Sequence, residues 1–176
     1  QFKKDFPNSK YLKLPAKGFD PNATNLQKFK HKYSTVGSIS KIHSMKEVNL
    51  SAPLYYNISV KLDGSSLVLY YVDGQLERAL TRGDGLYGLD VTNKVKYLCP
   101  EALTPKFFHE KPFTGAVRGE VVMSNCAFQE YKKDHPEAKM ARNVSTGLMM
   151  RKDVSEELKY CDYIAYKILA VENDAM

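Results

Sequence analysis

The strongest constraint on the fold is a β-hairpin predicted within residues 60–92. Residues 60–64 read Val-Lys-Leu-Asp-Gly, and an apolar run typical of a strand follows at residues 67–71. Asp73 and Gly74 then form a hairpin turn signal, and the chain alternates again between polar and apolar residues as far as Leu80. The pattern predicts an antiparallel sheet, with Lys61 at the start of the hairpin and an Arg-Gly-Asp-Gly sequence at its end.

Lys61 and Asp63 are two residues apart in a segment that we expect to be extended. Side chains in a strand alternate between two faces, so these two side chains share one face, and Gly64 lets another group approach the backbone. One interpretation is a surface ion pair ahead of a turn, because so short a pattern often arises by chance. The other is a nucleophilic lysine beside a carboxylate.

A nucleophilic lysine needs help from its surroundings. The pKa of a free lysine is about 10.4, so at pH 7 only about one amine in 2,500 is neutral and able to attack. Cationic neighbours or burial lower that pKa. Under the second interpretation, we expect arginines and a bound metal ion near Lys61.

Composition indicates one domain, because 176 residues of which 43% are hydrophobic can form one substantial core. The net charge is +6, and residues 1–50 hold ten lysines against three acidic residues, whereas residues 51–176 hold sixteen basic and seventeen acidic residues. The basic surplus therefore lies in the first fifty residues. It suits contact with a phosphate backbone, and a solvated lysine-rich surface explains it equally well.

The cysteines and the hydropathy favour a cytoplasmic protein. The three cysteines are widely spaced and include no Cys-x-x-Cys pair, which indicates reduced thiols and no zinc site. No apolar run approaches the roughly 20 residues that span a bilayer, and we find no targeting signal.

The remaining segments give a coarse prediction of secondary structure. Residues 1–20 predict an irregular lead-in, and residues 21–37 predict a helix with Leu26, Phe29 and Tyr33 on one face. Further predicted elements are strands at residues 54–60, 113–123 and 162–171, a helical turn at 93–98, a loop at 99–112, and a helix capped by Ser124 that buries Phe128 and Tyr131.

Residues 61–64 and 81–92 together resemble the nucleotidyl-transfer domain of DNA ligases, and the NAD-dependent family in particular. That family pairs K-L-D-G with T-R-G-D-G-x-x-G-x-D-V-T, which residues 81–92 match almost residue for residue. Weaker similarity extends over residues 40–171, including V-R-G-E-V at 117–121 and A-Y at 165–166. ATP-dependent relatives usually carry an arginine at the place of Ser66, so the nicotinamide branch fits better.

The resemblance implies a site. Lys61 accepts an adenylyl group and Asp63 orients it. Glu120 binds the ribose, arginines bind phosphates, and Tyr166 stacks on adenine unless it simply packs in the core. The nucleotide-binding residues implied in this way are Ser44, Met45, Ser59, Leu62, Gly64, Arg82, Arg118, Glu120, Arg142 and Tyr166. No metal ligand is assigned, and Arg151 is a weaker candidate for a phosphate contact.

The resemblance also implies an α+β nucleotidyltransferase (DNA ligase adenylation domain) fold, with mainly antiparallel sheets, flanking helices and an incomplete C-terminal end. We expect residues 1–39 to be a basic lead-in with a helix and residues 40–176 a partial adenylation domain. The family's two later lysine motifs and its module for nicotinamide mononucleotide (NMN) do not occur in this sequence. We therefore expect a truncated or split-subunit ligase, such as a phage or viral form, with a second polypeptide supplying those parts.

The implied reaction uses NAD and Mg²⁺. Lys61 forms a lysyl-AMP, the AMP passes to the 5′-phosphate of nicked double-stranded DNA, and the nick is sealed. Two alternatives remain open at this stage. One is an ATP-dependent DNA or RNA ligase. The other is a non-catalytic nucleotide-binding or DNA-binding subunit that needs a partner chain.

Overall fold

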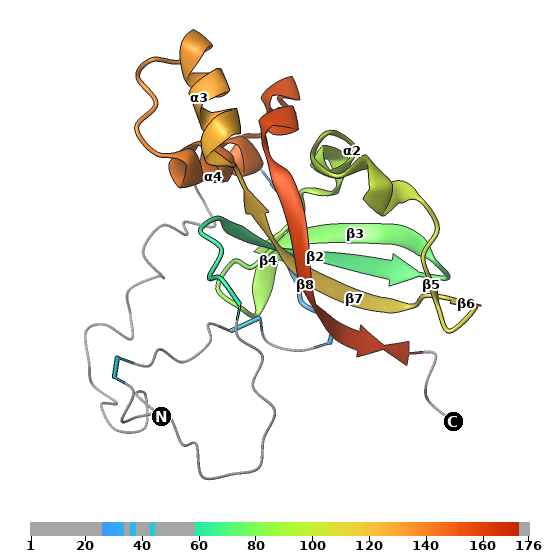
Figure 1. Cartoon of the computed structure of the whole chain (residues 1–176). Coiled ribbons are helices and arrows are strands. Elements are labelled where there is room, and N and C mark those ends of the chain that lie inside the picture. The colour runs from blue at the N-terminus through green and yellow to red at the C-terminus, as the bar shows by residue number, and fades with distance from the viewer. Residues whose placement is uncertain (1–25, 34–35, 38–42, 45–58, 173–176) are drawn as a thin grey trace.

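A computed structural model of the chain describes residues 26–33, 36–37, 43–44 and 59–172 (Figure 1). Its centre is a four-stranded antiparallel sheet in the order β3-β2-β7-β8. These strands are β2 (Ser65–Val72), β3 (Gln75–Thr81), β7 (Gly115–Val122) and β8 (Asp162–Val171). Two small antiparallel pairs flank it, β1 (Lys28–Lys30) with β4 (Tyr87–Leu89), and β5 (Phe107–Phe108) with β6 (Lys111–Pro112).

The helices gather on one side of this sheet, as Figure 1 shows for α2, α3 and α4. In chain order the helical elements are η3 (Thr92–Lys94), α2 (Val95–Leu98), η4 (Pro100–Leu103), α3 (Asn125–Asp134), α4 (Ala141–Met150) and η5 (Glu156–Tyr160). Within the described ranges, none of these helices has the length and apolarity to cross a bilayer. Antiparallel strands with flanking helices confirm the expected α+β class.

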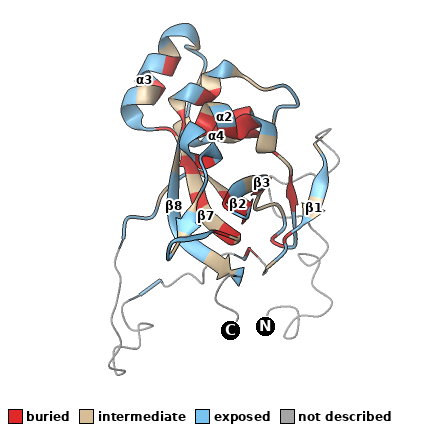
Figure 2. Cartoon of the chain, turned by 90° about the vertical axis from the view of Figure 1, so that its right-hand side faces the viewer, coloured by how far each residue is buried: buried red, intermediate tan, exposed pale blue. Residues whose placement is uncertain are grey.

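The sheet separates two hydrophobic cores, because successive side chains of a strand point to opposite faces. Leu67, Leu69 and Tyr71 of β2 belong to the larger core, which also contains buried side chains of α2, α3 and α4. Val68 and Tyr70 belong to the smaller core on the other face. Figure 2 shows buried residues at the sheet and on the parts of the helices that face it.

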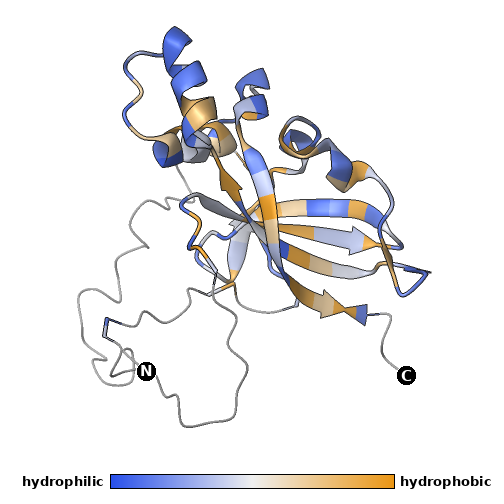
Figure 3. Cartoon of the chain, viewed as in Figure 1, coloured by the Kyte–Doolittle hydropathy of each residue, from blue (hydrophilic) through white to orange (hydrophobic). Residues whose placement is uncertain are grey.

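The edge strand β8 is hydrophobic without being covered. Figure 3 shows hydrophobic stretches along it, yet Ile164, Tyr166 and Ile168 are 42%, 48% and 49% exposed. The strand occupies the predicted residues 162–171. It is the outermost strand on its side of the sheet.

The predicted hairpin is confirmed in detail. Asp73 and Gly74 both have positive φ, 48° and 79°, which matches the two-residue turn expected between β2 and β3. The prediction for α3 is also confirmed, since Ser124 Oγ accepts the backbone N–H of Ala127 and the helix buries Phe128 and Tyr131.

The predicted helix at residues 21–37 is wrong within the described part of that segment. Residues 28–30 form strand β1, with Phe29 paired to Gly88 of β4. The apolar spacing suited a helix, but an extended chain supplies backbone partners for β4 and places Phe29 under the Arg78 guanidinium, 3.6 Å from its ring centroid. Just beyond β1, the ring of His31 bonds the Tyr70 hydroxyl at 2.7 Å, a tertiary contact that the local pattern could not reveal.

Three other predictions need revision or fall partly or wholly outside the described residues. The segment at residues 99–112 is not plain loop, because it contains η4 and the β5–β6 hairpin. Of the strand predicted at residues 54–60, only Ser59 and Val60 are described, and neither lies in a strand. The predicted lead-in at residues 1–20 lies outside the described residues.

The turn after β3 forms hydrogen bonds within itself. Asp84 Oδ1 accepts the backbone N–H groups of Leu86 at 2.9 Å and of Tyr87 at 2.7 Å. Gly83 has a φ of 57°, and a Cβ there would lie 1.8 Å from the Tyr87 carbonyl oxygen, so only glycine fits. Much of the motif at residues 81–92 therefore serves to fix the backbone next to Arg82.

Lys94 is a fully buried cation beneath the helices. Its Nζ donates hydrogen bonds to the backbone carbonyls of Leu148, at 3.0 Å, and of Arg151. These carbonyls lie at the C-terminal end of α4, where the helix itself supplies no partners. Burial, with a smaller contribution from the positive charge of Arg151, lowers the pKa of Lys94 to about 8.

The buried lysine should make stability depend on pH. The unfolded chain holds this proton up to the ordinary lysine pKa of 10.5, whereas the folded chain releases it near 8, so stability rises with pH between these values. We expect a gain of roughly 2 kcal/mol between about pH 8 and pH 10 relative to Lys94→Met, since one pKa unit corresponds to about 1.4 kcal/mol. Urea unfolding of both proteins across this pH range measures it, and a constant difference would contradict it.

Candidate active site

Several of the predicted site residues meet at one end of the sheet, where β2 begins and β3 ends. Arg118 and Glu120 lie on β7, opposite Val68 and Ser66 of β2. Their two-residue spacing places them on the same face, as predicted. Lys61 precedes β2 and Arg82 follows β3, so the hairpin brings both residues to this end of the sheet.

Glu120 is the electrostatic centre of the site. It is half-buried, and this burial raises the pKa of its carboxyl group above the ordinary value. Positive charges oppose that shift, and in decreasing order they belong to Arg118, Lys61, Arg142 and Arg82. Four cations from four separate segments thus lie within electrostatic range of one carboxylate.

The guanidinium of Arg118 is held in a fixed position. Its Nε donates to Ser66 Oγ at 3.1 Å and its Nη1 donates to the Gly37 carbonyl at 3.2 Å. It also lies 5.9 Å from the ring centroid of Tyr166. Ser66 therefore serves here as an acceptor for Arg118.

Asp63 pairs with Arg142 of α4, with 3.2 Å between the carboxylate and the guanidinium. Within the described residues the ion pair of Asp63 is with Arg142 and not with Lys61. Asp63 therefore joins residues 61–64, the lysine motif, to helix α4. Lys61 itself is exposed, and it lies with the three arginines within electrostatic range of Glu120.

Gly64 packs against the backbone of β7. A Cβ at this position would lie 2.0 Å from the Val121 carbonyl oxygen, closer than any real contact. The close approach expected at this glycine is thus confirmed, and the approaching group is the neighbouring strand. Glycine is required here because any side chain would push the lysine motif away from β7.

The other predicted residues are placed as follows. Leu62 is half-buried beside the lysine, while Ser44 and Ser59 are exposed, and Met45 lies outside the described residues. Tyr166 is 48% exposed, which rules out simple core packing. Arg151 forms an ion pair with Glu157 at 3.1 Å, at the far end of α4 from Arg142.

The sequence interpretation missed two sets of contacts. His31 Nε2 lies 3.2 Å from the Arg82 carbonyl, and the ring also bonds Tyr70, so a residue far away in sequence supports the arginine. Ser65 and Thr146 share a hydrogen bond of 3.0 Å between β2 and α4. The sequence could have suggested the Ser65–Thr146 contact, because residues 142 and 146 are four apart and therefore share a helix face.

No group of three or more His, Cys, Asp or Glu side chains comes together as a metal site within the part of the chain that the structure describes. Asp63 and Glu120 are the carboxylates of the site, and carboxylate oxygens are donors that Mg²⁺ accepts.

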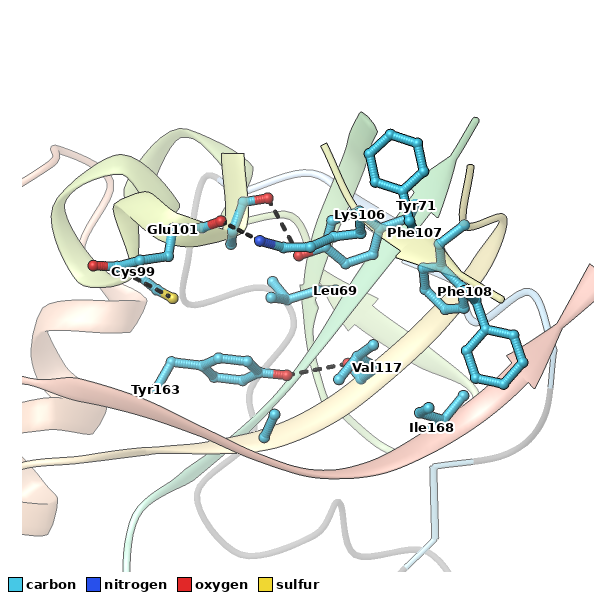
Figure 4. A pocket seen from close by; sticks show the side chains of 13 residues that line it. Leu69, Tyr71, Cys99, Glu101, Lys106, Phe107, Phe108, Val117, Tyr163 and Ile168 are labelled. Atoms are coloured by element: carbon cyan, nitrogen blue, oxygen red, sulfur yellow. Dashed lines mark hydrogen bonds between the residues drawn. The ribbon is translucent and has the colours of Figure 1, made fainter. Parts of the chain in front are cut away.

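An apolar pocket of about 320 Å³ lies on the other face of the sheet (Figure 4). It is lined by Leu69, Tyr71 and Val117, whose side chains alternate with those of the charged face. Tyr163 donates a hydrogen bond to the Val117 carbonyl there, at 3.1 Å. The charged residues and this pocket are therefore separate features, and the charged face is the better candidate for chemistry on an anion.

Guanidinium groups suit phosphates, and a carboxylate accepts hydrogen bonds from hydroxyl groups. The fold and the site together define an α+β domain with a candidate site for a nucleotide-like ligand, which carries both kinds of group. The identity of the domain follows from comparison with known proteins.

The chain belongs to the family of NAD-dependent DNA ligase adenylation domains, whose family model matches residues 24–176. It is 31% identical over 160 residues to a DNA ligase of Borreliella burgdorferi, covering 86% of this chain and 24% of that protein. DNA ligases of Treponema denticola and Lactobacillus delbrueckii are 37% and 40% identical over 63% and 57% of the chain. The chain spans only 15% to 24% of the length of these three curated relatives.

The raised pKa of Glu120 predicts a conflict between stability and ligand binding. A carboxyl group whose pKa is higher when folded destabilises the fold at pH values above that pKa, and this penalty disappears below its unfolded pKa. Glu120→Gln should therefore raise the melting temperature at pH 7, show no such gain below about pH 4, and weaken AMP binding. Thermal melts at both pH values and calorimetric AMP titration measure these effects. A lower melting temperature at pH 7 would contradict the prediction.

Proposed function

We propose that this chain carries the adenylation chemistry of an NAD-dependent DNA ligase within a nucleotidyltransferase fold. In this proposal Lys61 forms a covalent lysyl-AMP from NAD, the AMP passes to the 5′-phosphate at a nick in duplex DNA, and the nick is sealed. The observation that carries the proposal is the gathering of Lys61, Arg82, Arg118 and Arg142 around Glu120. Membership of the ligase family supports it.

In the first step the Lys61 amine attacks the adenylyl phosphorus of NAD. A nitrogen–phosphorus bond forms, the bond to the bridging pyrophosphate oxygen breaks, and NMN leaves with that electron pair while the amine loses a proton. The lysine side chain is exposed and lies three residues before Gly64, whose packing on β7 positions the segment that carries it. An accessible amine on a fixed backbone suits an attack that requires alignment with the leaving group.

The surrounding residues have separate roles in this proposal. The arginines neutralise charge that develops on the phosphate oxygens, and Arg118 is already held by Ser66 and Gly37 before any ligand binds. Glu120 accepts hydrogen bonds from the ribose hydroxyls. Tyr166, exposed on the same face as Arg118, offers its ring to adenine.

Mg²⁺ and partners belong to the same proposal. Mg²⁺ would balance the charge of the phosphates, held by the phosphates with Asp63 or Glu120, since it is usually bound through one or two carboxylates and substrate phosphates. Nicked double-stranded DNA is the proposed substrate, and a second polypeptide is a proposed partner. We place the reaction in the cytoplasm.

Two alternatives make different predictions about the nucleotide. An ATP-dependent DNA or RNA ligase would be charged by ATP in place of NAD. Ser66, bonded to Arg118, argues for NAD because ATP-dependent relatives carry an arginine there. A non-catalytic nucleotide-binding or DNA-binding subunit would bind reversibly and form no adduct.

The assignment of Lys61 is tested by mass spectrometry of the intact chain after incubation with NAD and Mg²⁺. We expect the mass to rise by one adenylyl group, and Lys61→Ala to abolish the adduct because Lys61 is the proposed nucleophile. Lys61→Arg is the matched control, since it keeps the positive charge next to Glu120 but offers no suitable nucleophile. It should also form no adduct.

The possible results separate the candidates. An adduct with ATP but not with NAD would favour the ATP-dependent alternative. An adduct that persists in Lys61→Ala would overturn the assignment of the nucleophile. Reversible AMP binding with no adduct from either nucleotide would favour the non-catalytic subunit.

A further inference from the structure

Helix α4 contacts the lysine motif at two positions one turn apart. Arg142 pairs with Asp63 at 3.2 Å, and Thr146 Oγ1 shares a hydrogen bond with Ser65 Oγ at 3.0 Å. Residues four apart on a helix share a face, and residues two apart in an extended chain share a side. The two contacts therefore join one stripe of α4 to one side of the segment that follows Lys61.

The same segment is held from its other side by β7. Ser65 pairs with Val121 in the sheet, and the Cα of Gly64 approaches the Val121 carbonyl so closely that a Cβ would lie 2.0 Å from it. Residues 63–65 are thus fixed between a strand and a helix. The Ser65–Thr146 bond closes this arrangement immediately next to Gly64.

Helix α4 is a firm support for these contacts. Leu148 and Met149 are buried in the larger core, and the Lys94 amine bonds carbonyls at the C-terminal end of the helix. The N-terminal end of α4 lacks a side-chain cap, because Met140 at the N-cap makes no such hydrogen bond. The contacts of Arg142 and Thr146 therefore hold the part of the helix that faces the lysine motif.

We infer that Thr146, through Ser65, is a positioning residue for Lys61. The bond that Thr146 makes is to Ser65 and not to Lys61, so in this inference it acts by fixing the backbone from which the nucleophile projects. The inference rests on the proposed function of Lys61 for its catalytic readout. A displacement of about 1 Å at a reacting group can lower a rate by as much as about a hundredfold, so one hydrogen bond here has a measurable effect.

The experiment compares Thr146→Val, which removes only the hydroxyl group, with Thr146→Ser, which keeps it. The single-turnover rate of adenylyl transfer to Lys61 at saturating NAD should fall about tenfold in Thr146→Val, the effect of losing one well-made hydrogen bond. The NAD concentration for half-maximal rate should change less than about threefold. Thr146→Ser should retain most of the rate, and Ser65→Ala should match Thr146→Val with no further loss in the double variant.

Thr114→Val is the matched control. Thr114 Oγ1 accepts the backbone N–H of Asp73 at 2.9 Å, at the hairpin end of the sheet, so this variant loses a similar bond far from Lys61. It should leave the transfer rate unchanged. A Thr146→Val rate equal to that of the wild type, or the same loss in Thr114→Val, would overturn the inference.

Amide hydrogen exchange gives a readout that needs no nucleotide. The amides of residues 61–66 should exchange faster in Thr146→Val than in the wild type, and at the wild-type rate in Thr146→Ser and Thr114→Val. Unchanged exchange in Thr146→Val overturns the inference even if Lys61 is adenylylated. If the wild type forms no adduct, the proposed function fails, and the exchange result still decides whether Thr146 positions the lysine motif.

Discussion

The antiparallel register between β2 and β7 is the constraint on which the site depends. It places Ser66 opposite Glu120 and Val68 opposite Arg118, with the two charged residues on the face away from the main core. A slip of one residue would turn both charged side chains into that core, because neighbouring residues of a strand face opposite ways. The Gly64 contact with β7 reinforces this register at the end where Lys61 lies.

The charges around Glu120 lower the stability of the fold and suit an anionic ligand. Several cations lie near one another, and Glu120 is partly removed from water. A carboxylate in such a place destabilises the folded state, and it is maintained because the rest of the sheet determines its position. A phosphate-bearing ligand would relieve the repulsion between the arginines. In the proposed function, the same carboxylate accepts hydrogen bonds from the ribose, so a group that weakens the free protein has a role in binding.

Local sequence predicted the strands of the hairpin, α3 and β8 well, because each has a pattern that its own residues complete. Ser124 caps α3 through a bond to Ala127 three residues away, and the hairpin turn needs only Asp73 and Gly74. The segment at residues 28–30 failed for the opposite reason. Its apolar spacing suits a helix, but its partner β4 lies about sixty residues along the chain, and the pairing with β4 decided its conformation.

The sequence by itself determined which residues carry charge in the candidate site, since Lys61, Arg82 and Glu120 stand in motifs that specify their own turns and strands. Tertiary structure alone decided what those residues touch. Asp63 pairs with a helix that begins almost eighty residues later, and Thr146 reaches Ser65 across the same distance. The physical reason is that side-chain contacts depend on how elements pack, whereas a motif constrains only the backbone near it.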